Sequence, residues 1–432
     1  MSMTQQILGN HIVEKDTRKP RIPEIGEIID VEIDITMVHE QLGGRIAPEY
    51  KKLELDYVKY PERIVYLLDH WVPSPSVPAA NMHNRANQFA RRYNFKHILG
   101  ENKGICHTVL PEQGYIYPGM VAIGSDSHST TYGAYNCFST GVGATDVCIV
   151  FATGKLWFKV PESLNFSISS AFQKGVYAKD LALYILQKHG TEEFIYRSLE
   201  YTGTGLKNLS MESRHTVANM CAEMGGKNAI FESDKITEQW FRNNFHFTAR
   251  HGTHIHPVSP EPSAEYNFIE EINLAEIRPL IAKPYSPDNV VEVNECIGTE
   301  LTQGFIGSCT NGSLEDLRIA AKILKGHTIH PNNRCIVIPA STEIYLNAMK
   351  EGLIEIFLKA GCIVGPSTCG PCFGGHMGIL GDEDVCISTT NRNYRGRMGS
   401  YDAEAYLASP ATVAASVIHG KITSPLDYSE VL

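Results

Sequence analysis

The chain has 432 residues, of which 43% are hydrophobic, and it carries a formal net charge of -10 at neutral pH. Because its basic residues are scattered along an acidic chain, we expect no nucleic-acid partner. No apolar run is long enough to cross a bilayer, and the first residues lack the apolar stretch of a signal peptide. We therefore predict a cytoplasmic chain that makes no membrane contact and is long enough for more than one domain.

Apolar runs rich in β-branched residues alternate along the chain with helix-like stretches. The apolar runs predict strands at residues 28–38, 120–125 and 333–340. The stretches with helical spacing of apolar residues predict helices at residues 61–71, 178–190 and 314–326. This alternation is typical of an α/β fold with largely parallel sheets.

Two proline-rich junctions interrupt the alternation, near residues 159–167 and 277–289. They predict three α/β domains, at residues 1–160, 161–285 and 286–432.

The polar stretch at residues 233–268 carries four histidines, at positions 246, 251, 254 and 256. Such a group can form a metal site, but no cysteine or carboxylate lies among these histidines at the spacing of metal ligands. We therefore predict solvated surface loops here.

Three of the eleven cysteines stand in a pattern that suits a metal group. Cys369 and Cys372 form a CxxC motif, and Cys309 lies sixty positions before Cys369. A closed electron-transfer cluster takes four thiolates, so a cluster held by three leaves one iron open to water or substrate. A lone CxxC also occurs in redox dithiols and zinc sites. The single motif and the glycines around it favour the cluster, and most other cysteines are expected to be core residues.

Seven blocks of the sequence, in this order, resemble the aconitase family, and within it the two-subunit isopropylmalate and homoaconitate hydro-lyases. The blocks are DH at 69–70, ICH at 105–107, YPGMVAIGSDSHSTTYGA at 117–134, ANMCAEMGG at 218–226, IGSCTN at 306–311, CGPC at 369–372 and TTNRNYRGRMG at 389–399. Together they span most of the chain. The resemblance implies three aconitase-type α/β domains around a central iron-sulfur cluster.

The resemblance also implies the cofactor and its ligands. One four-iron four-sulfur (4Fe-4S) cluster would be held by Cys309, Cys369 and Cys372, with one open iron. Asn219 and Asn391 would lie beside it.

Six catalytic residues are implied by the same resemblance, namely Asp69, His70, His107, Asp126, His128 and Glu223. The first two match a carboxylate–imidazole pair that protonates the leaving hydroxyl, because a carboxylate fixes the tautomer of its histidine. His107 and Glu223 match a second such pair near the metal-bound water. Asp126 and His128 would bond to that water or to the substrate hydroxyl.

Substrate contacts are implied for Ser127, Arg392 and Arg397, because a guanidinium group forms two hydrogen bonds to a carboxylate. Arg395 has no counterpart in the family, and we expect it in a basic surface turn. His39 falls where relatives carry a substrate-facing polar residue, although the following QLGGRIAPEY departs from the family's Thr/Ser-Pro-Gln continuation.

The implied activity is that of a hydro-lyase acting on a malate-type hydroxy acid, which is a small di- or tricarboxylate. 3-Isopropylmalate and homocitrate or homoaconitate are the leading substrates, and 2,3-dimethylmalate and 2-methylmalate are the alternatives. A non-catalytic iron-sulfur protein and an RNA-binding regulator are the rival classes.

In single-chain members of the family, a serine base lies on a fourth, swivelling domain. No match to that segment follows residue 400 of this sequence. The resemblance therefore implies a small subunit that supplies the swivelling domain with its serine base, in a heterotetramer.

Overall fold

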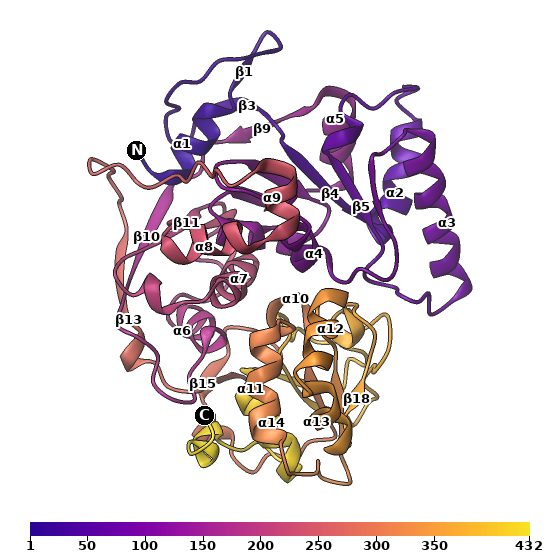
Figure 1. Ribbon diagram of the computed structural model, residues 1–432, viewed down its shortest axis with the longest axis vertical. Helices are drawn as coiled ribbons and strands as arrows, with labels where there is room; N and C mark the ends of the chain where they lie inside the picture. Colours follow the sequence, from indigo (N-terminus) through magenta and orange to yellow (C-terminus); the bar gives the residue numbers. More distant parts are fainter.

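The computed structural model describes residues 1–432 as a mixed α/β chain whose strands form three larger sheets of five, four and seven strands (Figure 1). All strand pairs within the first two sheets are parallel, and so are most pairs in the third. The predicted α/β fold with largely parallel sheets is therefore confirmed. No helix combines the length and the apolar character needed to span a membrane.

The first sheet has the strand order β6-β5-β4-β7-β8. Its strands are β4 (Ile35–His39), β5 (Ile64–Leu67), β6 (His97–Leu99), β7 (Val121–Gly124) and β8 (Phe138–Gly141). The helices around it are α2 (Glu40–Lys51), α3 (Val77–Arg92), α4 (Cys106–Glu112) and α5 (Ala144–Thr153). Figure 1 shows α2, α3 and α5 on one side of β4 and β5.

The helix predicted at residues 61–71 is wrong, because a short 3-10 helix, η1 (Pro61–Arg63), leads directly into strand β5. All four residues of β5 are buried. A continuous apolar run without a polar face is typical of a strand covered on both faces, and periodicity alone does not separate it from a buried helix.

The strand predicted at residues 28–38 is in fact two strands. β3 (Ile28–Glu32) pairs antiparallel with β9 (Lys155–Lys159), whereas β4 belongs to the first sheet. Between them Asp34 turns its carboxylate inward to accept a hydrogen bond from the Val121 N–H group at 2.8 Å. The preceding elements are α1 (Met3–Asn10), β1 (Val13–Glu14) and β2 (Thr17–Arg18).

The second sheet has the order β12-β11-β10-β13. Its strands are β10 (Ser163–Ser169), β11 (Ser198–Thr202), β12 (Asn228–Phe231) and β13 (Ile269–Asn273). Helix α6 (Ala178–His189) confirms the helix predicted at residues 178–190, and α7 (Met211–Met220) precedes β12.

The stretch at residues 233–268 is only partly the loop that was predicted. It begins with α8 (Lys235–Asn243) and α9 (Phe245–His251), and residues 252–268 form neither helix nor strand. Asp234 and Asn244 start the two helices, since their side chains accept hydrogen bonds from backbone N–H groups of the first turn. These capping residues were the sequence signal for the helices.

The third sheet has the order β15-β14-β20-β19-β16-β17-β18. Its strands are β14 (Leu280–Ala282), β15 (Val290–Glu292), β16 (Gln303–Ile306), β17 (Arg334–Val337), β18 (Ile363–Val364), β19 (Val385–Ser388) and β20 (Glu404–Ala408). Its helices are α10 (Ser308–Asn311), α11 (Leu314–Leu324), α12 (Thr342–Lys350), α13 (Leu353–Lys359) and α14 (Pro410–His419). The helix predicted at residues 314–326 and the strand predicted at 333–340 are confirmed by α11 and β17.

Short 3-10 helices connect these elements. They are η2 (Ser127–Tyr135), η3 (Leu206–Asn208), η4 (Cys221–Met224), η5 (Leu274–Glu276), η6 (Val293–Cys296), η7 (Gly370–Phe373) and η8 (Pro425–Tyr428). The strand predicted at residues 120–125 is confirmed by β7. The longest 3-10 helix, η2, follows this strand.

Helix η2 packs directly against strand β12 of the second sheet. The closest approach is at Gly133, where an added Cβ atom would lie 1.4 Å from the carbonyl oxygen of Ala229. Only glycine fits this position, because the opposing oxygen belongs to the backbone of a buried strand. The contact therefore fixes η2, and the loop before it, against the second sheet.

We expect Gly133→Ala to destabilise the chain by about 3 kcal/mol or more, since the methyl group overlaps backbone that cannot move aside cheaply. Differential scanning calorimetry should record a lower apparent melting temperature. Gly143→Ala is the matched control, because Gly143 has a φ of -78° and the nearest atom lies 3.7 Å from the added carbon. Equal melting temperatures for the two variants would contradict the predicted contact.

Candidate active site

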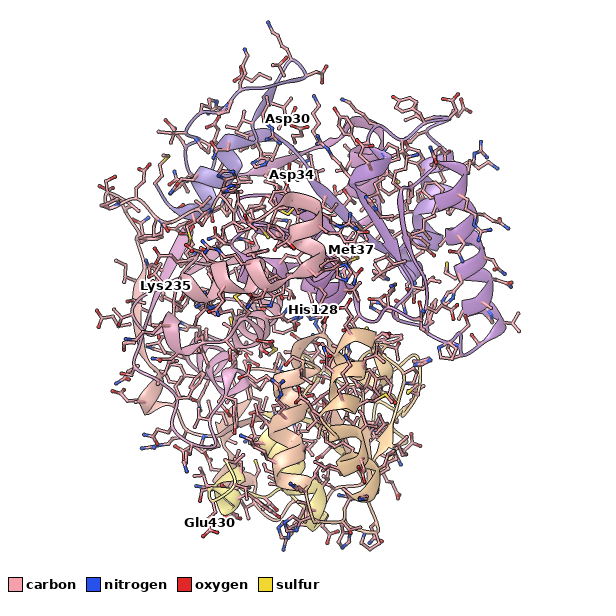
Figure 2. All side chains as sticks on the ribbon, in the orientation of Figure 1. Asp30, Asp34, Met37, His128, Lys235 and Glu430 are labelled. Carbon is pink, nitrogen blue, oxygen red and sulfur yellow. The ribbon has the colours of Figure 1, made fainter.

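A small cavity lies where residues from the first third of the sequence meet residues from its last third. It is lined by His70, Ile105, His107, Asp126, His128, Cys309, Cys369, Cys372, Phe373, Asn391 and Arg397. Figure 2 places His128 close to the middle of the molecule.

The order of the strands explains why these residues meet. His70 follows β5, Asp126 follows β7, Cys309 follows β16 and Asn391 follows β19. Each therefore lies beyond the carboxyl end of a parallel strand, which is where α/β sheets form their binding sites. The cavity combines such loops from the first and the third sheet.

The three cysteines of the predicted cluster site line this one cavity. The exposed fractions of Cys309, Cys369 and Cys372 are 8%, 7% and 5%. Two side-chain amides donate to the Cys309 sulfur, Nδ2 of Asn219 at 3.2 Å and Nδ2 of Asn391 at 3.4 Å. The structure thus brings the expected ligands and the two expected neighbours together.

The chemistry of the three thiols fits a metal group. Burial raises the pKa of Cys309 well above its usual value and that of Cys369 to about 12. Bound metal ions stabilise the thiolates that metal coordination requires. A reactive dithiol needs an accessible sulfur, and both sulfurs of the CxxC motif are buried. Among the eleven cysteines, only these three line the cavity.

Asp69 and His70 form the expected carboxylate–imidazole pair, with His70 Nδ1 donating to Asp69 Oδ1 at 2.6 Å. The second carboxylate oxygen of Asp69 accepts from the Cys106 N–H group at 2.8 Å. Burial alone would lower the pKa of His70, but the Asp69 carboxylate, with Cys369 and Asp126 nearby, raises it well above its usual value. These groups favour the protonated form of His70, and the bond to Asp69 fixes the orientation of its ring.

Glu40 is a site residue that the sequence analysis missed. Its buried carboxylate accepts hydrogen bonds from three consecutive N–H groups, those of Asp69 at 3.0 Å, His70 at 2.9 Å and Trp71 at 2.7 Å. Glu40 thereby fixes the backbone that carries the Asp69–His70 pair. Its only sequence signal is an acidic residue directly after a buried strand, which is equally typical of the first turn of a helix.

Asp126 is the centre of the histidine cluster. Its Oδ1 atom accepts from His107 Nε2 at 2.8 Å and lies 3.3 Å from His128 Nδ1. Its other oxygen lies 3.7 Å from His70 Nε2. Burial on its own would raise the pKa of Asp126, but hydrogen bonds from His107, His128 and His70 hold it well below the usual range. One ionised carboxylate thus connects all three histidines of the cavity.

The predicted pairing of His107 with Glu223 is wrong. Glu223 Oε1 accepts instead from His128 Nε2 at 2.8 Å, and Arg392 Nε donates to both oxygens of Glu223, at 2.8 and 2.9 Å. His107 is already bound to Asp126. The pairing could not be read from the sequence, because the three loops that decide it are distant along the chain.

The remaining candidates lie at different depths. Arg397 lines the cavity, and its buried Nε atom has no hydrogen-bond partner, which leaves it free for a ligand. Ser127 is exposed at the start of η2. Arg395 is exposed, as expected, and its Nε atom donates to the carbonyl oxygen of Tyr401.

His39 does not line the cavity. Its ring stacks on His70 with 4.3 Å between the centroids, and its Nε2 atom bonds to the Ser125 carbonyl oxygen at 3.1 Å. Burial lowers the pKa of His39 to about 4, so the ring is neutral. The structure therefore places His39 behind His70, where it supports that ring, and not at the expected substrate-facing position.

The chain matches known proteins over almost its full length. The sequence profile of the aconitase family (aconitate hydratase) matches residues 5–301 and 295–420. The 3-isopropylmalate dehydratase large subunit 1 of Methanopyrus kandleri is 43% identical over 94% of this chain and 96% of that protein. The 3-isopropylmalate dehydratase large subunit of Aquifex aeolicus is 43% identical over 98% of this chain and 97% of that protein.

Among solved structures, the holo form of aconitase X from Thermococcus kodakaraensis superposes with a TM-score of 0.50 at 11% identity. The superposition covers 87% of this chain and 88% of that one. At this identity the likeness bears on the fold alone.

We expect anaerobic reconstitution with iron and sulfide to give the chain the brown absorbance of an iron-sulfur cluster. The variants Cys309→Ser, Cys369→Ser and Cys372→Ser should each abolish this absorbance, because each removes one thiolate ligand. Iron and sulfide analysis with visible spectra would measure this. Cys137→Ser and Cys335→Ser are the controls, since both cysteines are buried outside the cavity. Full iron content in any of the first three variants would remove that cysteine from the ligand set.

Proposed function

We propose, since this chain belongs to the aconitase family of hydro-lyases, that it is the large subunit of a 4Fe-4S enzyme that isomerises a malate-type hydroxy acid by dehydration and rehydration. 3-Isopropylmalate is the foremost substrate, because it is named in both relatives described above. Homocitrate or homoaconitate is the second choice. The observation that carries the proposal is the convergence of three buried thiols with His70, Asp126 and His128 on one cavity.

In this proposal Cys309, Cys369 and Cys372 hold the cluster and leave one iron open. When bound, such a cluster supplies a Lewis acid for the substrate hydroxyl and a neighbouring carboxylate. Asn219 and Asn391 orient the Cys309 sulfur through their amide groups.

His70 is the proposed acid for the leaving hydroxyl. Its Nδ1 atom is held by Asp69, so the proton to be donated is at Nε2, on the side of Asp126 and the cavity. An acid fixed in this way has little freedom to turn away from the reacting oxygen, which is the condition for efficient proton transfer. Glu40 and His39 hold His70 in place from behind.

Asp126, His107 and His128 are proposed to bind the water or hydroxyl that leaves and returns. The Asp126 carboxylate already bonds to the two imidazoles, so all three side chains are held in place before the water or hydroxyl binds. Glu223 holds His128 from the side opposite Asp126.

Two arginines are proposed to bind substrate carboxylates. Arg397 has an unpartnered Nε atom at the cavity, and Arg392 uses Nε for Glu223, which leaves its terminal nitrogens for a ligand. Ser127, exposed next to Asp126, is a third proposed contact. A malate-type acid has carboxylates at both ends of a short carbon chain, and planar guanidinium groups suit these anions.

Both relatives are named as large subunits, which supports a small subunit as the partner of this chain. We propose that this partner carries the swivelling domain with the serine base, and that the complex is a cytoplasmic heterotetramer. The division into domains at residues 1–160, 161–285 and 286–432 stays a proposal. The first two larger sheets each lie within one of these segments, whereas strand β14 of the third sheet lies before residue 286.

We expect His70→Ala to lower the dehydration rate constant by about a hundredfold or more, because a positioned general acid is lost. The rate would be followed by alkene absorbance with 3-isopropylmalate in the presence of the small subunit, and iron analysis should show an unchanged cluster. His254→Ala is the control, since His254 is exposed on the loop after α9. A near-normal rate constant in iron-replete His70→Ala would remove His70 from the mechanism.

We expect the reconstituted chain alone to show negligible hydro-lyase activity, and activity to appear when a small subunit is added, because the proposed base lies on the partner. Comparing rates with 3-isopropylmalate, homocitrate and 2-methylmalate would then identify the substrate. Adding the partner should also tighten substrate binding, since closure over the cavity excludes water. Full activity of the chain alone would show that the base lies within these 432 residues.

A further inference from the structure

Lys179 is a fully buried lysine that the proposed mechanism does not use. It is the second residue of α6, and its exposed fraction is 0%. Its ammonium group donates to the carbonyl oxygens of Thr389 at 3.0 Å and Thr390 at 2.8 Å, and it lies 3.8 Å from the Met220 sulfur. None of these partners carries a charge. A buried ammonium group without a carboxylate is costly, so its position calls for an explanation.

The two carbonyl groups that bind Lys179 belong to the segment that carries Asn391 and Arg392. The same segment is tied to the Cys309 loop, because the Thr389 hydroxyl accepts from the Gly307 N–H group at 2.9 Å and donates to the Gly307 carbonyl oxygen at 3.0 Å. Helix α6 packs against strand β15 of the third sheet (Figure 1). Lys179 thus reaches from the second sheet's helix to the loops around the cysteines.

Four groups raise the pKa of Lys179 through their negative charge. They are, in order of their effect, Asp316, Cys309, Cys372 and Glu223. Burial raises the pKa of Asp316 to about 7, so this carboxyl is a weak counter-ion. Glu223 already binds His128 and Arg392. Cys309 and Cys372 both line the cavity, so the ammonium group of Lys179 lies within electrostatic range of the cysteine site.

The neighbouring carboxyl, Asp180, is engaged elsewhere. Its oxygens accept from the N–H groups of Tyr177 and Leu280, both at 2.8 Å. Burial raises the pKa of Asp180 to about 7 and lowers that of Lys179 to about 7. Without metal, burial therefore favours loss of the proton from Lys179. Thiolates at the cysteines would raise the pKa of Lys179 again.

We infer that Lys179 is a positioning residue for the cluster, whose ammonium group holds the 389–392 segment in place and offsets the negative charge of the thiolates. The inference rests on the proposed function, because it requires Cys309, Cys369 and Cys372 to hold a metal cluster. A fixed positive charge close to such a cluster raises its reduction potential and retains its iron.

The test compares three substitutions at this position in the full chain after anaerobic reconstitution. Lys179→Met removes the charge and the hydrogen bonds, Lys179→Gln keeps a donor for the carbonyl groups, and Lys179→Arg keeps the charge. Lys188→Met is the control, because Lys188 lies on the same helix, is 49% exposed and pairs with Glu270. The measurements are iron per chain, the midpoint potential of the cluster, and the rate of iron release to a chelator.

We expect Lys179→Met and Lys179→Gln to lower the midpoint potential and to release iron about tenfold faster, since each removes a buried positive charge beside the thiolates. Lys179→Arg should have a midpoint potential close to that of the unchanged chain. Lys188→Met should have the same potential and the same rate of iron release as the unchanged chain. Lys179→Gln loses the charge but keeps a hydrogen-bond donor. A lower midpoint potential in this variant would therefore be due to the lost charge and not to the lost hydrogen bonds.

Unchanged potential and release rate in iron-loaded Lys179→Met and Lys179→Gln would overturn the inference. So would failure of both neutral variants to fold before iron is added, since the ammonium group would then serve the fold and not the cluster. If the unchanged chain itself takes up no cluster, the proposed function fails first. The iron content of the unchanged chain therefore distinguishes the two failures.

Discussion

The central cavity depends on one constraint, which is that several ionisable groups are buried together and each must find a partner there. Asp126 satisfies three imidazoles at once, and Glu223 satisfies His128 and Arg392. Removing either carboxylate would leave buried cationic partners without their counter-charge. The loops that carry them are therefore held in one arrangement by their mutual hydrogen bonds.

The architecture serves this constraint by bringing carboxyl ends of parallel strands from two sheets to the same point. The second sheet contributes from the side, through α6, through α7 with Asn219, and through the close contact of Gly133 with Ala229 that fixes η2. Groups outside the cavity then fix those inside it. Glu40 holds the backbone of His70, and Lys179 holds the segment before Asn391. Positioning in this protein is thus distributed over the whole chain.

Sequence reasoning reached the family and most of the residues that line the cavity, because short motifs preserve the residue types that the chemistry needs. It failed where the outcome depended on packing. The apolar run at residues 61–71 became strand β5, because it is covered on both faces. Glu40 stayed unnoticed, because an acidic residue at the start of a helix looks like an ordinary capping residue. The partner of Glu223 was misassigned, because the pairing depends on loops far apart in the sequence.

The sequence by itself determined the α/β class, the family and the three cysteines that face one cavity. The class follows from local periodicity, and the family and the cysteines follow from short motifs that occur in the family's order along the chain. Only the tertiary structure decided which carboxylate holds which histidine, that His39 lies behind His70, and that a buried lysine reaches the segment beside the cysteines. The physical reason is that hydrogen bonds and buried charges act over a few ångströms in space. Chain order does not reveal which distant side chains come within that range.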